Sequence, residues 1–498
     1  MSSIKRNIAA NLIGKIWAAS IAILLIPQYI KYLGIESYGL IGFYSTLSGS
    51  LAVLDLGLSI TLNRELAKLK SEKRSIKDLR DLTFSLERIY WLIGIIICLS
   101  IVALAGFIAH HWVNVERLPL DTVNRSVMLM GAVFAFQWPI SLYSGGLTGL
   151  DKQLFNNAIT VVMVTLRAAG VILILKFVSP TLQAFFLWQA AISFLYVITL
   201  RWGLWNKMPT HSNRPVFSKV QIKVIWRFAA GMTGISFITF FITQVDKIIL
   251  SKILSLSQFG YYTLAFTIAN SVSLIVQPIS LTFFPQFTHF VATNSENELK
   301  ALYHQACRLM SALIFPVCFV LLFFTKDILN IWTKNSLTSE NTYRMAQILI
   351  VGSIFNSLMV MPFNLLLANG RTKFTIYQNT IAAIILVPLL FIWTNLYGAI
   401  GATFVWIAVN AGYVFISQPI MHRTLLKNEL KRWYINDSLL QMMPSLITIV
   451  SIKLGLQYFF PALHLTLFLI CCISFAVLAV SLLNMPYSIK LIKKMLKY

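Results

Sequence analysis

Charge, and acidic charge above all, is scarce in this sequence. Only 12% of the 498 residues are charged, and 17 acidic residues stand against 41 lysines and arginines, which gives a formal net charge of +24. Hydrophobic residues make up 57%, and the mean hydropathy is +0.75. A soluble protein cannot bury so much apolar surface, so the composition predicts a polytopic membrane protein. The excess of lysine and arginine then indicates cytoplasmic loops rather than nucleic-acid binding.

Cysteine is also rare, and a nucleotide-binding loop is absent from the sequence. The five cysteines fall in apolar runs without metal spacing or a disulfide framework, so we expect them to be packing residues (Cys98, Cys307, Cys318, Cys471 and Cys472). The seven histidines show no ligand spacing either. We therefore expect no metal, no cofactor and no catalytic residue, and we do not expect an enzyme.

Apolar runs of about 20 residues or more dominate the chain instead. No alternating strand pattern dominates, so helices rather than a barrel are predicted to span the membrane. We predict 14 membrane helices, over residues 8–30, 38–62, 84–109, 125–148, 154–178, 181–204, 226–250, 259–284, 305–325, 343–368, 374–394, 398–420, 439–459 and 463–484. The first run is too long for a signal peptide and carries Asn11 and Lys15, so it is predicted to be an uncleaved first helix.

The positive charges follow a clear topology. With the N-terminus inside, roughly 30 of the 41 lysines and arginines fall on the cytoplasmic side and about eight in the outer loops. This asymmetry supports an even number of helices and cytoplasmic termini. The outer loops contain at most about 15 residues, so we expect no domain on that face.

The sequence also contains an internal repeat. Residues 33–47 (LGIESYGLIGFYSTL) align with residues 254–268 (LSLSQFGYYTLAFTI) at an offset of 221 residues. Two further matches at offsets of 221 and 218 pair residues 147–155 with 368–376 and residues 184–190 with 402–408. These matches predict two parallel six-helix lobes, the frame of an alternating-access transporter. The predicted parts are an N-terminal lobe (1–206), a basic cytoplasmic linker (207–225), a C-terminal lobe (226–422), and helices 13 and 14 with a basic tail (423–498).

Ionisable residues within the predicted spans are candidates for a binding site. Arg167 lies near the middle of the 154–178 span, where a charge costs roughly 2.5–3.5 kcal/mol on insertion scales. It is expected to face a wet cavity or to form a structural ion pair with an acid such as Asp55, in the 38–62 span. Asp246 and Lys247 lie near the outer end of the 226–250 span, where extension of the side chain to the interface is an equal alternative.

Polar stripes at helical spacing accompany these residues. The stripes comprise Asn7, Asn11 and Lys15, then Ser236, Thr239 and Thr243, then Asn270, Ser273 and Gln277. Together they predict a water-filled cleft between the lobes, with polar contacts between packed helices as the alternative. Arg64 and Arg88 lie near the inner mouth, where the general excess of cytoplasmic positive charge is the stronger explanation.

Six segments resemble a known family. They are LGIESYGLIGFY, LDLGLSITLNRELA, VDKIILSKILSLSQFGYY, FFPQFTHF, ILNIWTK and LLLANGRTKF. The chain resembles the polysaccharide flippases of the multidrug/oligosaccharidyl-lipid/polysaccharide exporter superfamily, above all the O-antigen (Wzx-type) group. The resemblance implies two six-helix lobes, often with two extra helices, and transfer of an undecaprenyl-pyrophosphate-linked oligosaccharide across the bacterial inner membrane. It also implies cations in a central cavity, for which Arg167, Arg64 and Lys247 are the candidates.

The source of energy and the partners follow from the same comparison. With no nucleotide-binding loop, an ion gradient or consumption of the product outside is expected to drive transfer, and Asp55 and Asp246 are candidates to carry a coupling proton or sodium ion. Membrane lipid and the polymerase and glycosyltransferases of the pathway are the expected partners. A multidrug/cation antiporter is the first alternative, although such exporters typically have 12 helices and acidic cavities. A membrane-embedded polysaccharide polymerase, glycosyltransferase or ligase is disfavoured by the short outer loops, and a channel or scaffold leaves the repeat unexplained.

Overall fold

The structure is a computed structural model. It describes the backbone of residues 3–51, 55, 57–68, 75–223, 244–459 and 467–483, and the side chains from residue 14 onward within these ranges except those of residues 51 and 467. Two compact units divide the chain, residues 1–260 and residues 261–498. The predicted lobe boundaries remain a prediction, since this division falls within the predicted C-terminal lobe.

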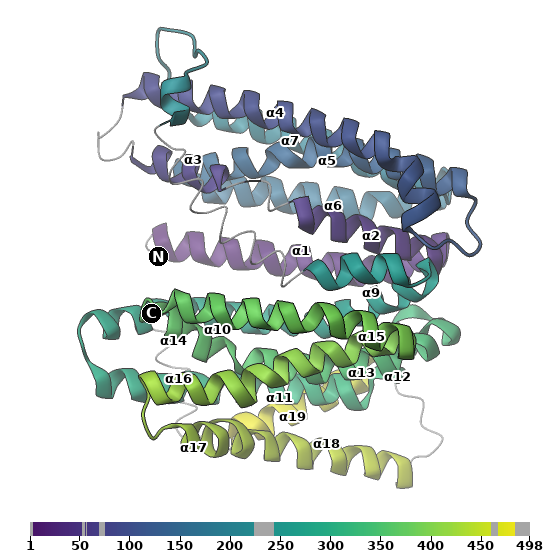
Figure 1. Ribbon diagram of the computed structural model, residues 1–498, viewed down its shortest axis with the longest axis vertical. Helices are drawn as coiled ribbons and strands as arrows, with labels where there is room; N and C mark the ends of the chain where they lie inside the picture. The colour runs from purple at the N-terminus through teal and green to yellow at the C-terminus, as the bar shows by residue number, and fades with distance from the viewer. Residues whose placement is uncertain are drawn as a thin grey trace. The chain divides into compact units, whose positions relative to one another are not determined.

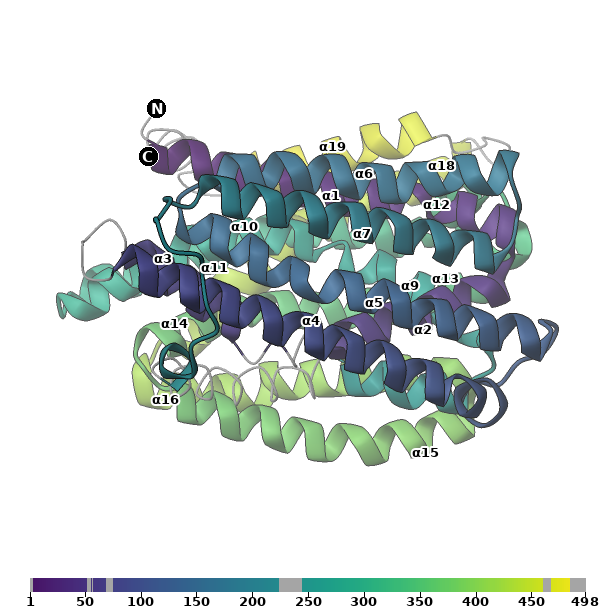
Figure 2. The same ribbon diagram turned by 90° about the horizontal axis from the view of Figure 1, so that it is seen from above.

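Unit 1 is built from long helices (Figure 1). They are α1 (Ser3–Leu33), α2 (Ile35–Leu51), α3 (Leu58–Ala67), α4 (Ile76–Phe107), the π-helix η3 (Ile108–Trp112), α5 (Leu120–Gly149), α6 (Gln153–Phe177) and α7 (Leu182–Lys207). Residues 244–253 are helical, and α9 (Leu256–Asn270) begins in this unit. In both views α5 runs beside α4 and α7, and α6 packs on α1 (Figures 1 and 2).

The second predicted helix, 38–62, is interrupted at Gly57, whose φ of 67° lies in the left-handed region that glycine adopts at little cost. Within this range the structure describes α2 up to Leu51 and α3 from Leu58. Small residues also bring α3 close to α5. A Cβ atom on Gly149 would lie 2.4 Å from the carbonyl oxygen of Asn63. The break and the close approach together place the short α3 directly on α5.

Unit 2 is also helical. It contains α10 (Ser273–Ala292), α11 (Glu296–Phe323), α12 (Thr325–Thr333), α13 (Ser336–Leu358), α14 (Val360–Ala368), α15 (Thr372–Gly412), the π-helix η4 (Tyr413–Ser417), α16 (Gln418–Leu425), α17 (Leu430–Arg432), the π-helix η5 (Trp433–Leu439), α18 (Leu440–Phe459) and α19 (Leu467–Leu483). α18, α19 and η5 pack on α11, so the two helices outside the repeat are fixed to this unit.

One predicted boundary in unit 2 agrees with the structure and one differs. The predicted helices 374–394 and 398–420 correspond to the two parts of α15, which are separated by non-helical backbone at Gly398, where φ is 60° and ψ is −146°. The predicted helix 439–459 begins earlier, because α17 and η5 lead into α18 from Leu430. The predicted turn at residues 395–397 thus survives as a sharp bend at glycine rather than as a loop.

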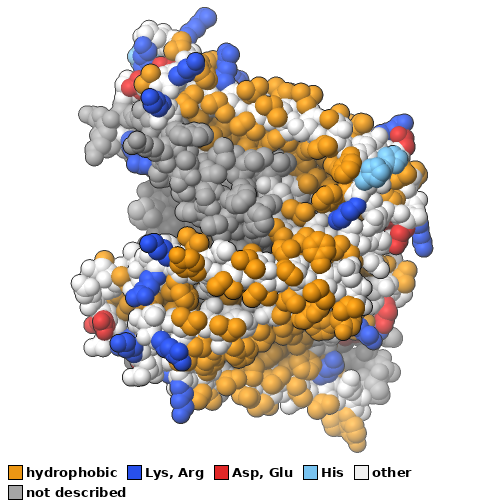
Figure 3. Space-filling view, in the orientation of Figure 1, with side chains coloured by type: hydrophobic (Ala, Val, Ile, Leu, Met, Phe, Trp, Pro, Cys, Tyr) orange, Lys and Arg blue, Asp and Glu red, His pale blue; other side chains and the backbone are white. Residues whose placement is uncertain are grey.

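The flanks of the helices are suited to lipid. Ten helices of the described residues are long and apolar enough to cross a membrane, and the shorter apolar helix Phe468–Leu483 adds to them. The predicted span 226–250 lies mostly outside the described residues. On the face shown in Figure 3, hydrophobic side chains cover the flanks of each unit and charged side chains gather toward the helix ends. The predicted all-α polytopic class is confirmed, and the count of about 14 helices is compatible with it.

The internal repeat is visible in the packing of unit 1. A Cβ atom on Gly39 would lie 2.0 Å from the carbonyl oxygen of Leu256, and one on Gly260 would lie 2.5 Å from that of Ile35. Ile35 and Gly39 precede Leu256 and Gly260 by the same 221 residues. The two contacts are therefore counterparts of each other, so residues 35–39 and residues 256–260 pack together in the symmetric way that a two-fold repeat predicts.

Candidate functional site

A carboxylate two residues before the interruption at Gly57 lies among hydroxyl groups. Asp55 accepts hydrogen bonds from Ser59 of α3 (2.6 Å), Tyr90 of α4 (2.5 Å) and Ser141 of α5 (2.9 Å). Broken helices that turn polar groups toward their neighbours form the ion sites of many membrane transporters. Asp55 and the three hydroxyl groups can therefore hold a proton or a small cation.

Aromatic side chains enclose part of this carboxylate. Tyr90 is fully buried, and its ring centroid lies 5.9 Å from that of Trp138. The indole nitrogen of Trp138 is buried and has no hydrogen-bond partner in the described part of the chain. Asp55 itself keeps partial exposure. A change in the charge of Asp55 would therefore act on a partly buried environment, in which electrostatic effects are stronger than in water.

Arg167 lies on α6 of the same unit and is half-buried. Its guanidinium group acts electrostatically on the hydroxyl groups of Tyr29 and Tyr44, which come from α1 and α2. Within the residues that the structure describes, no carboxylate pairs with Arg167. The alternative of an ion pair with Asp55 is not realised, because Asp55 bonds to hydroxyl groups instead. Arg167 thus lies in a predicted membrane span without a carboxylate partner among the described residues.

Polar side chains from neighbouring helices lie within electrostatic reach of this cation. Tyr44 accepts a hydrogen bond of 2.7 Å from Gln137 of α5. On α7, the hydroxyl group of Tyr196 lies 2.8 Å from that of Thr160 and is also within electrostatic reach of Arg167. Hydroxyl and amide groups beside a guanidinium can hydrogen-bond to phosphate and sugar oxygens.

The structure pairs Asp246 and Lys247 with each other. Their ammonium and carboxylate groups lie 3.2 Å apart, and their side chains are only 10% and 16% exposed. The charge of Lys247 is therefore largely balanced by its neighbour. The predicted stripe of Ser236, Thr239 and Thr243 lies outside the described residues.

The remaining predicted residues are dispersed over exposed positions. Lys15, Arg64 and Arg88 are exposed on α1, α3 and α4, and Asn270 and Gln277 are exposed on α9 and α10; the side chain of Asn11 lies outside the described residues. Arg88 stacks over the ring of Phe84 at 4.8 Å. The structure thus groups Asp55 with hydroxyl groups and Arg167 with tyrosines, and it does not bring the other candidates to either group.

Several buried polar residues were not anticipated from the sequence. Glu87 of α4 is 6% exposed and accepts hydrogen bonds from Arg201 (2.5 Å) and Trp205 (2.8 Å) of α7. The available signal was its spacing of three from Tyr90, which puts both on one helix face. No cluster of three or more metal-ligating side chains occurs among the described residues.

Comparisons with known proteins agree with this architecture. The family of polysaccharide biosynthesis proteins matches residues 4–291, and the MatE family matches residues 232–392. A putative O-antigen transporter of Shigella flexneri is 22% identical over 411 residues, which cover 81% of this chain and 94% of that protein. The lipopolysaccharide biosynthesis protein WzxC of Escherichia coli K12 is 23% identical over 383 residues, 74% of this chain and 73% of that protein.

Solved structures share the fold at low identity. The lipid II flippase MurJ in an inward closed conformation superposes with a TM-score of 0.65 at 14% identity, over 95% of this chain and 97% of that chain. An inward-facing multidrug resistance MATE transporter of the MOP superfamily gives a TM-score of 0.67 at 11% identity, over 83% of this chain and 96% of that chain. The chain belongs to the polysaccharide biosynthesis protein family and is a Wzx-type member of the multidrug/oligosaccharidyl-lipid/polysaccharide exporter superfamily.

Proposed function

We propose that the chain is a flippase that transfers an undecaprenyl-pyrophosphate-linked oligosaccharide, an O-antigen or related repeat unit, from the cytoplasmic to the periplasmic leaflet by alternating access. It resides in the bacterial inner membrane with both termini in the cytoplasm. Family membership and the names of the relatives support this assignment. The observation that carries it is Arg167, a half-buried membrane cation without a carboxylate partner in the described part of the chain.

The chemistry of Arg167 fits a pyrophosphate. A guanidinium group donates parallel hydrogen bonds that match phosphate oxygens, and its attraction for an anion is stronger in a weakly polar site than in water. The hydroxyl groups of Tyr44 and Tyr196 supply further donors beside it. The lipid tail can stay in the bilayer, so the protein needs to hold only the pyrophosphate and the sugars.

Asp55 supplies a means of coupling to an ion gradient. A protonated Asp55 donates one hydrogen bond, so it can no longer accept all those from Ser59, Tyr90 and Ser141 in their present arrangement. At least one hydroxyl group must then turn, which alters the contact of α3 with α4 and α5. Asp246, already paired with Lys247, is the second candidate for the coupling ion.

Complementation with Arg167 variants tests the proposal. In a host that lacks the gene, Arg167→Gln is expected to lower surface polysaccharide at least about tenfold, since it removes a charge-assisted contact worth about 1.5–3 kcal/mol. Arg167→Lys keeps the charge and should restore part of the activity, and the exposed Arg88→Gln should retain full activity at equal protein abundance. Full activity of Arg167→Gln would remove the main support for an anionic substrate.

A multidrug/cation antiporter is the second candidate, because the MatE family also matches this chain. Arg167, which has no carboxylate partner among the residues that the structure describes, disfavours a cationic substrate. If the gene protects its host from cationic drugs while surface polysaccharide is unaffected by its deletion, the antiporter is the correct assignment. A membrane-embedded polysaccharide polymerase is a weaker candidate.

A further inference from the structure

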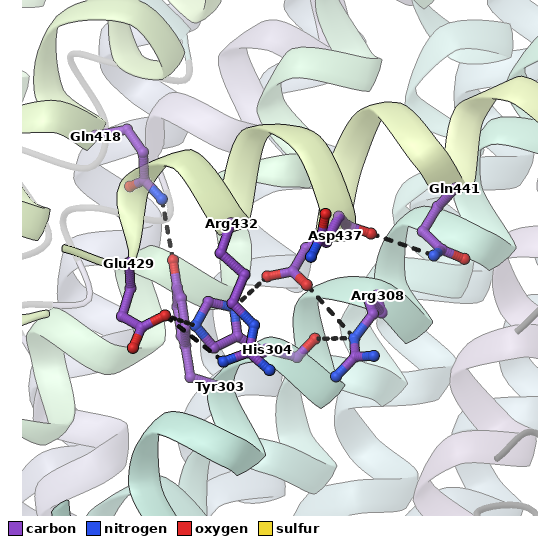
Figure 4. Close-up of polar contacts among 9 residues, drawn as sticks. Tyr303, His304, Arg308, Gln418, Glu429, Arg432, Asp437 and Gln441 are labelled. Atoms are coloured by element: carbon purple, nitrogen blue, oxygen red, sulfur yellow. Dashed lines mark hydrogen bonds and ion pairs between the residues drawn. The ribbon is translucent and has the colours of Figure 1, made fainter. Parts of the chain in front are cut away.

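A cluster of charged side chains is buried in unit 2, away from Arg167 and Asp55 in the chain (Figure 4). His304 of α11 is completely buried, and so is Asp437 of η5. The Nδ1 atom of His304 contacts a carboxylate oxygen of Asp437, and its Nε2 atom lies 3.0 Å from a carboxylate oxygen of Glu429. The imidazole ring therefore lies between two carboxyl groups.

Two arginines complete the cluster. The Nε atom of Arg308, one turn along α11, lies 3.4 Å from Asp437, and Arg432 lies 3.6 Å from Glu429. The side chain of Glu429 is 22% exposed and that of Arg432 is 47% exposed, so this end of the cluster meets solvent. Burial thus increases from Glu429 to Asp437, with His304 between them.

The hydrogen bonds of His304 require an extra proton. A neutral imidazole carries one N–H group and can donate to only one of two carboxylates. Both contacts become hydrogen bonds only if the imidazole is doubly protonated or if one carboxyl group is protonated and donates to the ring. In either case the three groups together hold one proton more than a neutral histidine with two carboxylates.

The proton lies at a junction between separate elements. His304 belongs to α11, whereas Glu429 and Asp437 precede α18, which belongs to the part of the chain outside the internal repeat. The π-helical turn of η5 directs Asp437 toward His304 (Figure 4). π-Helical turns are rare and often mark functional positions.

We propose that His304, Asp437 and Glu429 form a proton-binding site whose proton fastens the α17–α18 segment to α11. The remaining groups around the ring are Arg308, Tyr303 and Cys307 from α11, Arg432 from α17 and His422 from α16. Loss of the proton as the pH rises leaves one carboxylate facing a ring nitrogen without hydrogen. The contact between the α17–α18 segment and α11 is then weaker at high pH and stronger at low pH. The inference is independent of the transported substrate.

A native cysteine can report on this junction. Cys307 is 4% exposed and contacts Tyr303 and Trp433, so a maleimide reaches it only when the segment separates from α11. Cys318, on the same helix and completely buried, is the internal reference. The experiment uses full-length protein with Cys98, Cys471 and Cys472 replaced by serine. The alkylation rate of Cys307 is divided by that of Cys318, and each is normalised to its rate in denaturant at the same pH.

The expected ratio rises with pH between about 6 and 8.5, since the loss of one hydrogen bond between charged groups changes an equilibrium about tenfold or more. His304→Gln should give a high ratio at every pH. Glu429→Gln alters only the partly exposed end of the cluster, so its ratio should change less with pH than that of the wild type. His289→Gln is the control: this histidine is exposed on α10 and lies outside the cluster, so its variant should behave as the wild type. A wild-type ratio that does not vary with pH, or a pH response that survives in His304→Gln, would overturn the proposal.

Discussion

Asp55 is a residue of unit 1 at which the gain of a single proton would alter contacts with several helices. Its oxygens accept hydrogen bonds from three helices. Asp55→Asn keeps the size of the side chain but cannot change charge. We expect this variant to lose the pH dependence of transport, measured as uptake of a lipid-linked oligosaccharide analogue by proteoliposomes between pH 5.5 and 8. Ser141→Ala removes one donor and leaves the carboxylate, so it should keep the dependence.

The same experiment separates Asp55 from the second acidic candidate. If Asp246→Asn rather than Asp55→Asn removes the pH dependence, then the pair with Lys247 carries the ion. If the double variant still transports with the pH profile of the wild type, neither carboxylate couples transport to protons.

Glu116, which lies outside the membrane spans, should make the stability of the fold depend on pH. Its carboxylate accepts a hydrogen bond of 2.6 Å from the Ser257 hydroxyl group, and hydrogen bonding from Ser257 and Ser255 lowers its pKa from the ordinary value of 4.5. A lowered pKa means that this contact stabilises the fold above the ordinary pKa and that the contribution is lost as the pH falls through the lowered value.

The thermal unfolding midpoint of Glu116→Gln should therefore be lower than that of the wild type at pH 6, and the difference should shrink as the pH falls below 4.5. The exposed Asp121→Asn, which affects only an i,i+4 surface pair with Arg125, should show little change at pH 6. Equal unfolding midpoints of Glu116→Gln and the wild type at pH 6 would show that the Ser257 contact contributes nothing.

At the scale of helices, the close packing of residues 35–39 of α2 on residues 256–260 of α9 depends on Gly39. Because a Cβ atom there would lie 2.0 Å from the carbonyl oxygen of Leu256, the helices must separate to accept alanine. Gly39→Ala should destabilise the protein by about 1–3 kcal/mol, the usual cost of an overpacked contact. Gly260→Ala should act alike, because its contact with Ile35 is the counterpart.

Gly106→Ala on α4 is the matched control. A Cβ atom there would meet nothing within 4 Å, so the change should be neutral or stabilise the helix by about 0.5–1 kcal/mol. Thermal unfolding in detergent measures all three variants. Equal midpoints for Gly39→Ala and Gly106→Ala would show that the crossing tolerates a wider spacing.

Most helices were predictable, and their interruptions were less so. Long apolar runs fix where spans lie, because the bilayer demands about 20 apolar residues whatever the fold. Beside the interruption at Gly57, Asp55 makes polar contacts with Tyr90 and Ser141, which are 35 and 86 positions away in the sequence. The hydropathy of residues 38–62 does not indicate these partners.

In the candidate site, too, the presence of a charged residue was predictable from the sequence and its partners were not. Arg167 was predictable because a charge inside a span is costly wherever it occurs. That it would lack a carboxylate partner in the described residues was not predictable, and neither was the pairing of Asp246 with its neighbour. The cluster of His304 and Asp437 joins residues 133 positions apart, and isolated histidines give no spacing signal.

At the scale of the whole molecule, the central claim is that a lipid-linked oligosaccharide changes leaflets. The most direct measurement is the sidedness of that lipid in the inner membrane of a host that lacks the gene. Right-side-out and inverted membrane vesicles are treated with a glycosidase or a lectin that cannot cross the bilayer, and the accessible fraction of intact repeat units is counted.

We expect the repeat units to accumulate on the cytoplasmic leaflet in the deletion strain, to reach the periplasmic leaflet again with the wild-type gene, and to remain inside with Arg167→Gln. Repeat units that reach the periplasmic leaflet normally without the gene would contradict the account.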